Sequence, residues 1–291
     1  MSGTPETKVN SQLIAGLSTI ALAIALMVGT VLCMQRCVAE LPSATTMETT
    51  LPATTVVAGP TLPALAPNPY GPGDFAYNGG YLTCLTGKSH LGVDVSEYQG
   101  QIDWQQVAQS GIEFAVIRLG FRAWGASGEL HADAYALENL KGAVDAGLKI
   151  GVYFVSQAIT EKEAEEEASM VLDMLDGMQL HLPVVFDWER VSASDARTAQ
   201  MTSKQLNACT MAFCQKIEEA GYDAMVYFNQ DMAKRMFDLQ ALQDAGFDFW
   251  LAMYSNSMTY PHKIAMWQYS DGGTVPGIKG NVDLNLYFVY E

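Results

Sequence analysis

The 291-residue sequence predicts an α/β fold, an irregular TIM-like (β/α) barrel, and three observations favour that class. Short apolar runs alternate with stretches of helical periodicity through residues 91–291, as in a parallel sheet covered by helices. Polar side chains gather where the runs end, which is where such barrels carry their functional residues. The runs are eight, at residues 91–95, 114–119, 149–155, 183–188, 224–228, 249–253, 264–269 and 282–286. An open doubly wound sheet is the competing topology.

Helices are expected at residues 104–110, 132–146, 161–175 and 203–220. Each is followed by a glycine, the usual residue after a helix end: Gly111, Gly147, Gly177 and Gly221. The last intervals between runs leave little room for full helices, so the barrel is expected to be irregular. No G-x-G-x-x-G or G-x-x-x-x-G-K pattern follows the first run, and a nucleotide site therefore has no support.

Residues 13–34 form an apolar run without a charged side chain, preceded by a short tail at residues 1–12. The run is long enough to cross a bilayer as a helix, and we expect a transmembrane anchor. The alternative is a cleaved signal peptide on a secreted protein, although the apolar core of a signal peptide is typically shorter. Lys8 and Arg36 lie on either side of the run, so charge hardly decides its orientation.

Residues 35–87 are rich in Thr, Pro and Ala and are expected to form a linker. Frequent proline without hydrophobic periodicity favours an extended chain over a packed core. Residues 74–90 are a transition, which we expect to be partly ordered by docking onto the domain that follows. The folded domain is predicted at residues 88–291.

Charge and cysteine content exclude several function classes. The formal net charge is −16, of which −15 falls in residues 91–291, and an acidic domain argues against nucleic acid as a partner. The five cysteines form no C-x-x-C pair and no Cys/His cluster with zinc spacing, so neither a metal site nor a cofactor is expected. Cys209 and Cys214 are predicted to be core thiols.

The run at residues 182–189 ends in two carboxylates, Asp187 and Glu189. Residues i and i+2 of a strand point to the same side, so these two side chains should project together. Burial and a neighbouring like charge raise the pKa of a carboxyl group, which lets one of a pair stay protonated while the other is ionised. The two side chains of an isolated D-x-E are more often solvated in a loop. Here the polar residues at the ends of the other runs favour a functional site instead.

The remaining runs end in a set of side chains typical of a sugar-cleaving site. Carboxylates perform the hydrolysis, aromatic rings stack on sugar faces, and amides bind hydroxyl groups. These residues are Asp94 at the end of the first run, Tyr153 in the third, Tyr227 in the fifth, Tyr254 after the sixth, Gln268 in the seventh, and Asp283 and Asn285 in the eighth.

Several segments resemble the glycoside hydrolase family 25 lysozymes, in matching order over residues 88–291. They are Gly92-Val93-Asp94-Val95-Ser96-Glu97-Tyr98-Gln99-Gly100, Ala115-Val116-Ile117-Arg118, Gly151-Val152-Tyr153-Phe154, residues 183–189, Trp267-Gln268-Tyr269-Ser270, and Val282-Asp283-Leu284-Asn285. The resemblance does not extend to the predicted anchor and linker.

This resemblance implies hydrolysis of the β-1,4 bond between N-acetylmuramic acid and N-acetylglucosamine in peptidoglycan glycan strands. Glu189 would be the general acid/base, and Asp187 would stay ionised and orient the 2-acetamido group of the substrate, which itself attacks the anomeric carbon. Asp94 and Asp283 match two further active-site aspartates of the family. Tyr153, Tyr227 and Gln268 are expected to bind substrate, and no cofactor is implied.

With the predicted anchor, the resemblance indicates a single-pass cell-membrane protein whose catalytic domain is extracytoplasmic. Two alternatives are a wall-binding module without turnover and another N-acetylhexosamine-specific glycosidase, such as a chitinase. Stereochemical outcome, oligomeric state, preferred peptidoglycan modification and biological role stay open.

Overall fold

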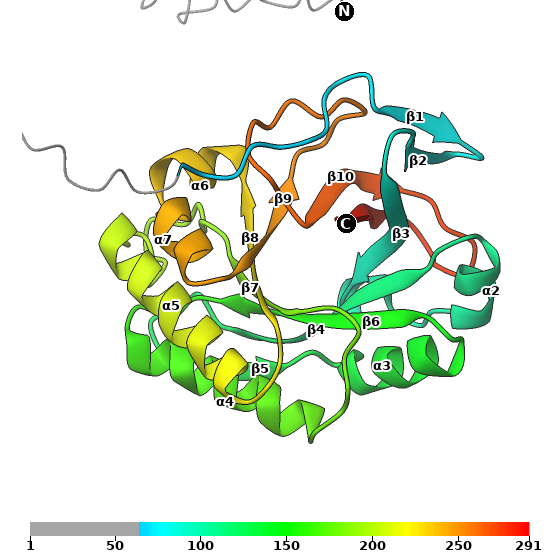
Figure 1. Cartoon of the computed structure of the whole chain (residues 1–291). Coiled ribbons are helices and arrows are strands. Elements are labelled where there is room, and N and C mark those ends of the chain that lie inside the picture. The colour runs from blue at the N-terminus through cyan, green and yellow to red at the C-terminus, as the bar shows by residue number, and fades with distance from the viewer. Residues whose placement is uncertain (1–63, 291) are drawn as a thin grey trace, which may run out of the picture. The chain divides into compact units, whose positions relative to one another are not determined.

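The computed structural model describes residues 64–290, whose strands close into a barrel (Figure 1). The strands are β1 (Phe75–Asn78), β2 (Tyr81–Cys84), β3 (Lys88–Val95), β4 (Phe114–Arg122), β5 (Leu130–Ala132), β6 (Lys149–Ser156), β7 (Val184–Trp188), β8 (Ala224–Asn229), β9 (Asp248–Ala252), β10 (Met266–Gly273) and β11 (Val282–Val289). The helices are η1 (Glu97–Gln99), α2 (Trp104–Gln109), α3 (Ala136–Asp145), α4 (Glu161–Leu175), α5 (Ser203–Glu219), α6 (Gln230–Arg235) and α7 (Leu239–Asp244).

Eight strands form the closed ring, in the order β3-β4-β6-β7-β8-β9-β10-β11 and back to β3. These are the eight predicted runs, and the pairing of β3 with β4 excludes the open sheet. The prediction of a parallel sheet was wrong for one strand, because β11 runs antiparallel to both of its neighbours. Residues 274–281, which join β10 to β11, are too few for the helical crossover that a parallel strand requires.

Helices α2, α4 and α5 confirm three predicted helices, and α4 and α5 begin at threonine caps. Thr160 accepts a hydrogen bond from the Glu163 N–H, and Thr202 and Gln205 form a capping box. The helix predicted at residues 132–146 starts only at Ala136, because residues 130–132 instead pair with β4 as strand β5. The sequence did not indicate the short helices α6 and α7.

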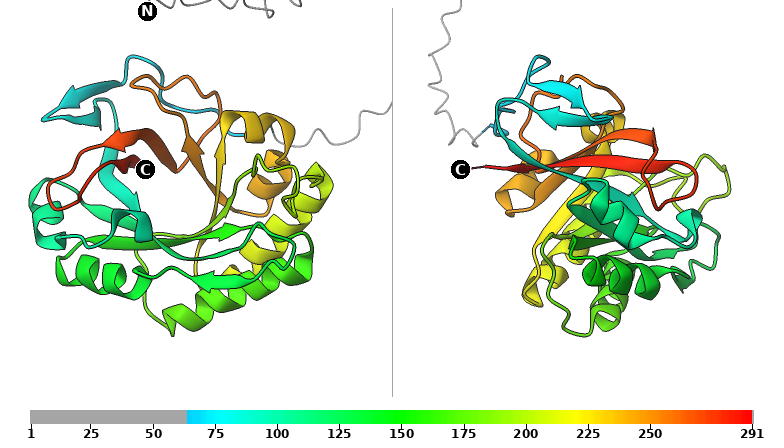
Figure 2. Two further views of the ribbon diagram at one scale, coloured as in Figure 1. Left: turned by 180° about the vertical axis from the view of Figure 1, so that it is seen from behind. Right: turned by 90° about the vertical axis from the view of Figure 1, so that its right-hand side faces the viewer.

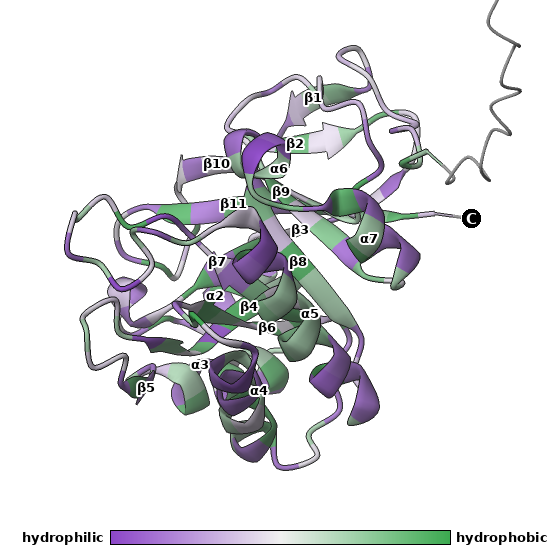
Figure 3. Ribbon diagram, turned by 90° about the vertical axis from the view of Figure 1, so that its left-hand side faces the viewer, coloured by the Kyte–Doolittle hydropathy of each residue, from purple (hydrophilic) through white to green (hydrophobic). Residues whose placement is uncertain are grey.

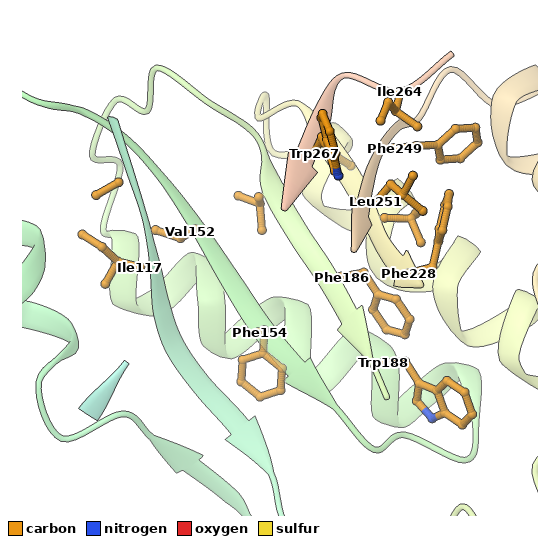
Figure 4. Packing of buried hydrophobic residues seen from close by; sticks show 14 of the residues in the cluster. Ile117, Val152, Phe154, Phe186, Trp188, Phe228, Phe249, Leu251, Ile264 and Trp267 are labelled. Atoms are coloured by element: carbon orange, nitrogen blue, oxygen red, sulfur yellow. The ribbon is translucent and has the colours of Figure 1, made fainter. Parts of the chain in front are cut away.

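The strands alternate between two apolar layers. Val185 faces the barrel interior, while Val184, Phe186 and Trp188 face outward into the larger core beneath the helices. Figure 4 shows that outer layer, with Phe186 beside residues of neighbouring strands. On the hydropathy scale of Figure 3 the strand β8 is apolar, whereas the helices around it carry both colours. Cys209 and Cys214 are buried on α5, as predicted for core thiols.

The hairpin β1–β2 covers the part of the barrel wall that has no helix. Phe75 packs edge-on against Trp267 of β10, with ring centroids 5.1 Å apart, and the Leu82 N–H donates to the Tyr269 hydroxyl at 3.3 Å. Tyr70 lies against Phe288 of β11 at 4.9 Å. Figures 1 and 2 show the hairpin on the opposite side of the barrel from α3 and α4.

The boundary predicted at residue 88 is therefore too late. Residues 64–87 were assigned to the linker, but Leu65, Tyr70, Phe75, Tyr81 and Leu82 join or pack against the outer core. The Ala66 N–H also donates to the Gln243 side chain of α7 at 2.9 Å. The predicted tail, the transmembrane anchor at residues 13–34 and the linker as far as residue 63 lie outside the described residues. Within residues 64–290, no helix has the length and apolar character needed to cross a membrane.

Candidate active site

A pocket of about 230 Å³ opens at the ends of the barrel strands. The structure brings all seven residues expected in the site to its walls: Asp94, Tyr153, Asp187, Glu189, Tyr227, Gln268 and Asp283. Six of them lie on, or directly after, strands that pair in parallel with a neighbour in the ring. Asp283 instead lies at the start of β11, and the reversed direction of that strand brings its first residues to the same rim.

Asp187 and Glu189 differ in their surroundings. Asp187 is 7% exposed and projects inward on the same face of β7 as Val185, and its Oδ1 is buried without a hydrogen-bond partner in the protein. Glu189 follows the last residue of β7 and is exposed at the rim. Both line the pocket, as the two-residue spacing predicted.

Burial, followed by repulsion from Glu189 and Asp94, raises the pKa of Asp187 well above its usual range. Withdrawal from water and the charge of Asp94 also raise the pKa of Glu189. The protonated form of Asp187 is therefore favoured in the protein alone, whereas the sequence led us to expect the ionised form. Its Oδ1 accepts no hydrogen bond that would stabilise a negative charge.

Asp94 and Asp283 face each other across the antiparallel pairing of β3 and β11. Burial, the charge of Asp94 and a hydrogen bond between the two carboxyl groups together raise the pKa of Asp283 to about 8. The same hydrogen bond lowers the pKa of Asp94. Asp283 is thus the protonated member of the pair and donates a hydrogen bond to Asp94. The net pKa of Asp94 is still raised, since its own burial is the largest effect.

Two amides hold the carboxylate of Asp94. The Gln268 Nε2 and Asn285 Nδ2 groups donate to its Oδ2 at 2.9 and 2.7 Å, and both bonds lower its pKa. Asn285 is itself oriented by the Trp250 indole N–H, which donates to Asn285 Oδ1 at 2.9 Å. These bonds fix the orientation of the Asn285 amide, because its nitrogen donates to Asp94 and its oxygen accepts from Trp250. We call Gln268, Asn285 and Trp250 the amide clamp.

The hydroxyl groups of Tyr227 and Tyr254 both donate to Gln268 Oε1, at 2.9 and 3.2 Å. With its oxygen accepting twice and its nitrogen donating to Asp94, Gln268 keeps one N–H for any other partner. The geometry therefore gives Gln268 a role in holding Asp94, besides the predicted contact with substrate.

Arg118 is the cation at the pocket wall, and its charge is balanced by two carboxylates. Its Nε donates to Asp133 Oδ2 at 2.8 Å, and one terminal nitrogen lies 3.2 Å from Glu97 Oε1. The guanidinium group stacks under the exposed ring of Tyr98, 5.0 Å from its centroid. Its positive charge lowers the pKa of Asp187 but does not offset burial.

Within residues 64–290, no three His, Cys, Asp or Glu side chains are grouped so that they could hold a metal ion. The chemistry available in the pocket is that of carboxyl groups with different proton affinities, beside hydrogen-bonding amides and aromatic rings.

Residues 93–278 match the model of the glycosyl hydrolases family 25. The chain belongs to this family. It is 27% identical over 197 residues to the autolytic lysozyme of Clostridium acetobutylicum, covering 67% of this chain and 55% of that protein. It is 26% identical over 204 residues to lysozyme M1 of Streptomyces globisporus, covering 67% of both chains.

The fold of this family 25 hydrolase is similar to that of LytC, a modular autolysin of Streptococcus pneumoniae. The TM-score is 0.59 at 24% identity, over 69% of this chain and 47% of LytC. This hydrolase therefore spans about half the length of LytC and of the clostridial lysozyme.

Three side chains of the family 25 site were missed from the sequence: Arg118, Trp250 and Tyr98. Arg118 could have been found from the sequence, because it is a charged residue that interrupts the apolar run at residues 114–119. Trp250 gave none, since an aromatic residue in a buried strand normally belongs to the core. Tyr254 and Asn285 were noted as strand-end residues, but only the structure connects them to Gln268 and Asp94.

Proposed function

We propose that this hydrolase is an N-acetylmuramidase, which cleaves the β-1,4 bond between N-acetylmuramic acid and N-acetylglucosamine with assistance from the substrate's acetamido group. The observation that carries the proposal is the buried, unpartnered Oδ1 of Asp187 at the pocket wall beside Glu189. An acetamido N–H is the kind of donor that this oxygen lacks. Family membership and a LytC structure described as a complex with a synthetic peptidoglycan ligand support the substrate class.

The proposed steps use the residues already placed. A hydrogen bond from the acetamido N–H stabilises ionised Asp187, so its pKa falls and its proton passes to solvent when substrate binds. The acetamido oxygen attacks the anomeric carbon as Glu189 gives its proton to the leaving glycosidic oxygen. Glu189 then removes a proton from the water that opens the oxazolinium ion, and hydrolysis is complete. Asp94, which accepts a hydrogen bond from Asp283, holds negative charge near the sugar ring.

The test is the Glu189→Gln variant of the full chain acting on purified peptidoglycan, with Glu219→Gln, exposed at the end of α5, as the control. General acid catalysis contributes roughly 10²–10⁴ in rate, so a loss of that size is expected only at position 189. Mass spectrometry should find reducing N-acetylmuramic acid ends. Reducing N-acetylglucosamine ends, faster cleavage of chitin oligomers, or wall binding without new reducing ends would each refute the proposal.

We also propose that residues 13–34 anchor the enzyme in the cell membrane with the barrel extracytoplasmic. The uninterrupted apolar run supports this. Protein that stays with membranes after alkaline carbonate extraction, and that is digested by protease added to intact protoplasts, is the expected result. Recovery of a shortened chain from the medium would favour signal cleavage and secretion instead.

A further inference from the structure

The peptide group of Glu189 lies one residue beyond the last paired residue of strand β7. The last pair in the ladder between β6 and β7 joins Ser156 to Trp188. Glu189 is the residue after β7, and Gln157 is the residue after β6. A carboxyl group that transfers a proton must be held within a fraction of an ångström, so the chain needs another constraint at this position.

Gln157 supplies that constraint through its side chain. Its Nε2 donates to the backbone oxygen of Glu189 at 3.0 Å, which extends the cross-strand bonding by one residue. Gln157 is 3% exposed, so little water competes for this bond.

Two residues at the other end of the loop that carries Glu189 form hydrogen bonds with Gln157. Its Oε1 accepts a hydrogen bond from the Thr198 hydroxyl at 2.6 Å, and its backbone oxygen accepts one from Arg197 at 3.0 Å. Arg197 is fixed in turn by Glu163 of α4 at 2.6 Å. Gln157 therefore joins both ends of residues 189–198 and connects them to the helix behind.

We infer that Gln157 is a positioning residue for Glu189. It does not line the pocket and is not expected to touch substrate. It acts by fixing the Glu189 peptide and so the direction of the carboxyl group. This inference rests on the proposed role of Glu189 as the acid/base.

The test compares Gln157→Met with Gln243→Met in the full chain, using a soluble peptidoglycan glycan fragment. Gln243 also makes a hydrogen bond to backbone, to the Ala66 N–H at 2.9 Å, but belongs to α7 away from the pocket. We expect Gln157→Met to lower kcat about tenfold with KM unchanged within about twofold, because misplacement of a catalytic group affects turnover more than binding. The pH dependence of kcat should shift as well. Gln243→Met should leave both unchanged.

An unchanged kcat, or a lower kcat whose pH profile matches that of the wild type and which follows only the fraction unfolded, would overturn the inference. If Gln157→Met does not fold, Thr198→Val removes only the support at Oε1, and a fall of about threefold in kcat is then expected; an unchanged kcat would overturn it. Full activity of Glu189→Gln would refute the acid/base role itself. An inactive Glu189→Gln with an unimpaired Gln157→Met would refute the positioning role alone.

Discussion

Asp283 is paired directly with Asp94 across strands β11 and β3, and the two carboxyl groups share one proton. The pairing follows from the direction of β11, which turns the beginning of the last strand toward the rim. Because the pKa of Asp283 is raised to about 8, Asp283 acts near neutral pH as the hydrogen-bond donor of this pair. An amide could take the same place.

We therefore expect Asp283→Asn to keep activity at pH 6 within about tenfold of wild type, since the amide N–H can still donate to Asp94. Asp283→Ala removes the donor, and loss of a hydrogen bond to a charged group should reduce the rate by a further factor of roughly 10–100. Initial rates on peptidoglycan measure both. Equal damage from the two substitutions would contradict this account.

The second prediction concerns stability and the buried Asp187. Its folded pKa is raised above the unfolded value of about 3.9, so its contribution to stability is complete below pH ~4 and is lost as the pH rises toward the folded pKa. Asp187→Asn has no proton to take up on folding. The variant should be inactive and should gain in Tm relative to wild type between pH 4 and pH 7.

The control for this effect is Asp173→Asn, exposed on α4, whose Tm difference from wild type should be the same at both pH values. Thermal unfolding followed by circular dichroism gives the comparison. A Tm difference for Asp187→Asn that does not grow between pH 4 and pH 7 would show that Asp187 is not titrating as described.

The third prediction concerns the amide clamp. Asn285→Leu leaves the Trp250 N–H without a partner and removes one of the two hydrogen bonds to Asp94 Oδ2, the bond from Gln268 remaining. One unsatisfied buried group costs about 1–3 kcal/mol of unfolding free energy. Because the Asn285 bond lowers the pKa of Asp94, its loss should move the acid limb of the pH–rate profile to higher pH. Urea denaturation and rates between pH 3 and 7 test both effects. Asn256→Leu, in an exposed loop, should show neither.

The fourth prediction separates the linker from the barrel. Removal of residues 1–87 takes away the hairpin and uncovers Trp267, Tyr269 and Phe288. Exposing a large apolar side chain costs roughly 1.5–3 kcal/mol, so the total reaches several kcal/mol and should lower Tm by more than about 10 °C. Removal of residues 1–63 should leave Tm within about 2 °C. Similar Tm values for the two truncated chains would show that the hairpin does not support the barrel.

The barrel was predictable because each strand carries its own local signal. Every ring strand is an apolar run with turn residues at its ends, and Asp187 and Glu189 share a face simply because the strand period is two. Docking of residues 74–90 onto the barrel was expected, but the two strands of the hairpin were not, because β1 and β2 are short and lie among prolines and glycines. Their burial depends on Trp267 and Phe288, more than 180 residues away along the chain.

The proton arrangement could not be predicted for the same reason. The resemblance identified Asp187 by its neighbours in sequence, whereas its pKa depends on burial and on the charges of Glu189, Asp94 and Arg118. Asp94 and Arg118 belong to two other strands, β3 and β4. Likewise, Gln268 was recognisable as a polar residue at a strand end. Its bonds to Tyr227, Tyr254 and Asp94 exist only after the barrel has closed.

Closure of the barrel by β3 and β11 has a kinetic consequence. Asp94 and Asn285 are 191 residues apart, and they meet only when the first and last strands of the ring pair. Contacts of such long range form late in folding, because the chain must give up much of its freedom before they are made. Enzyme activity during refolding should therefore return together with the final tertiary signal and never ahead of it, with no active intermediate along the way.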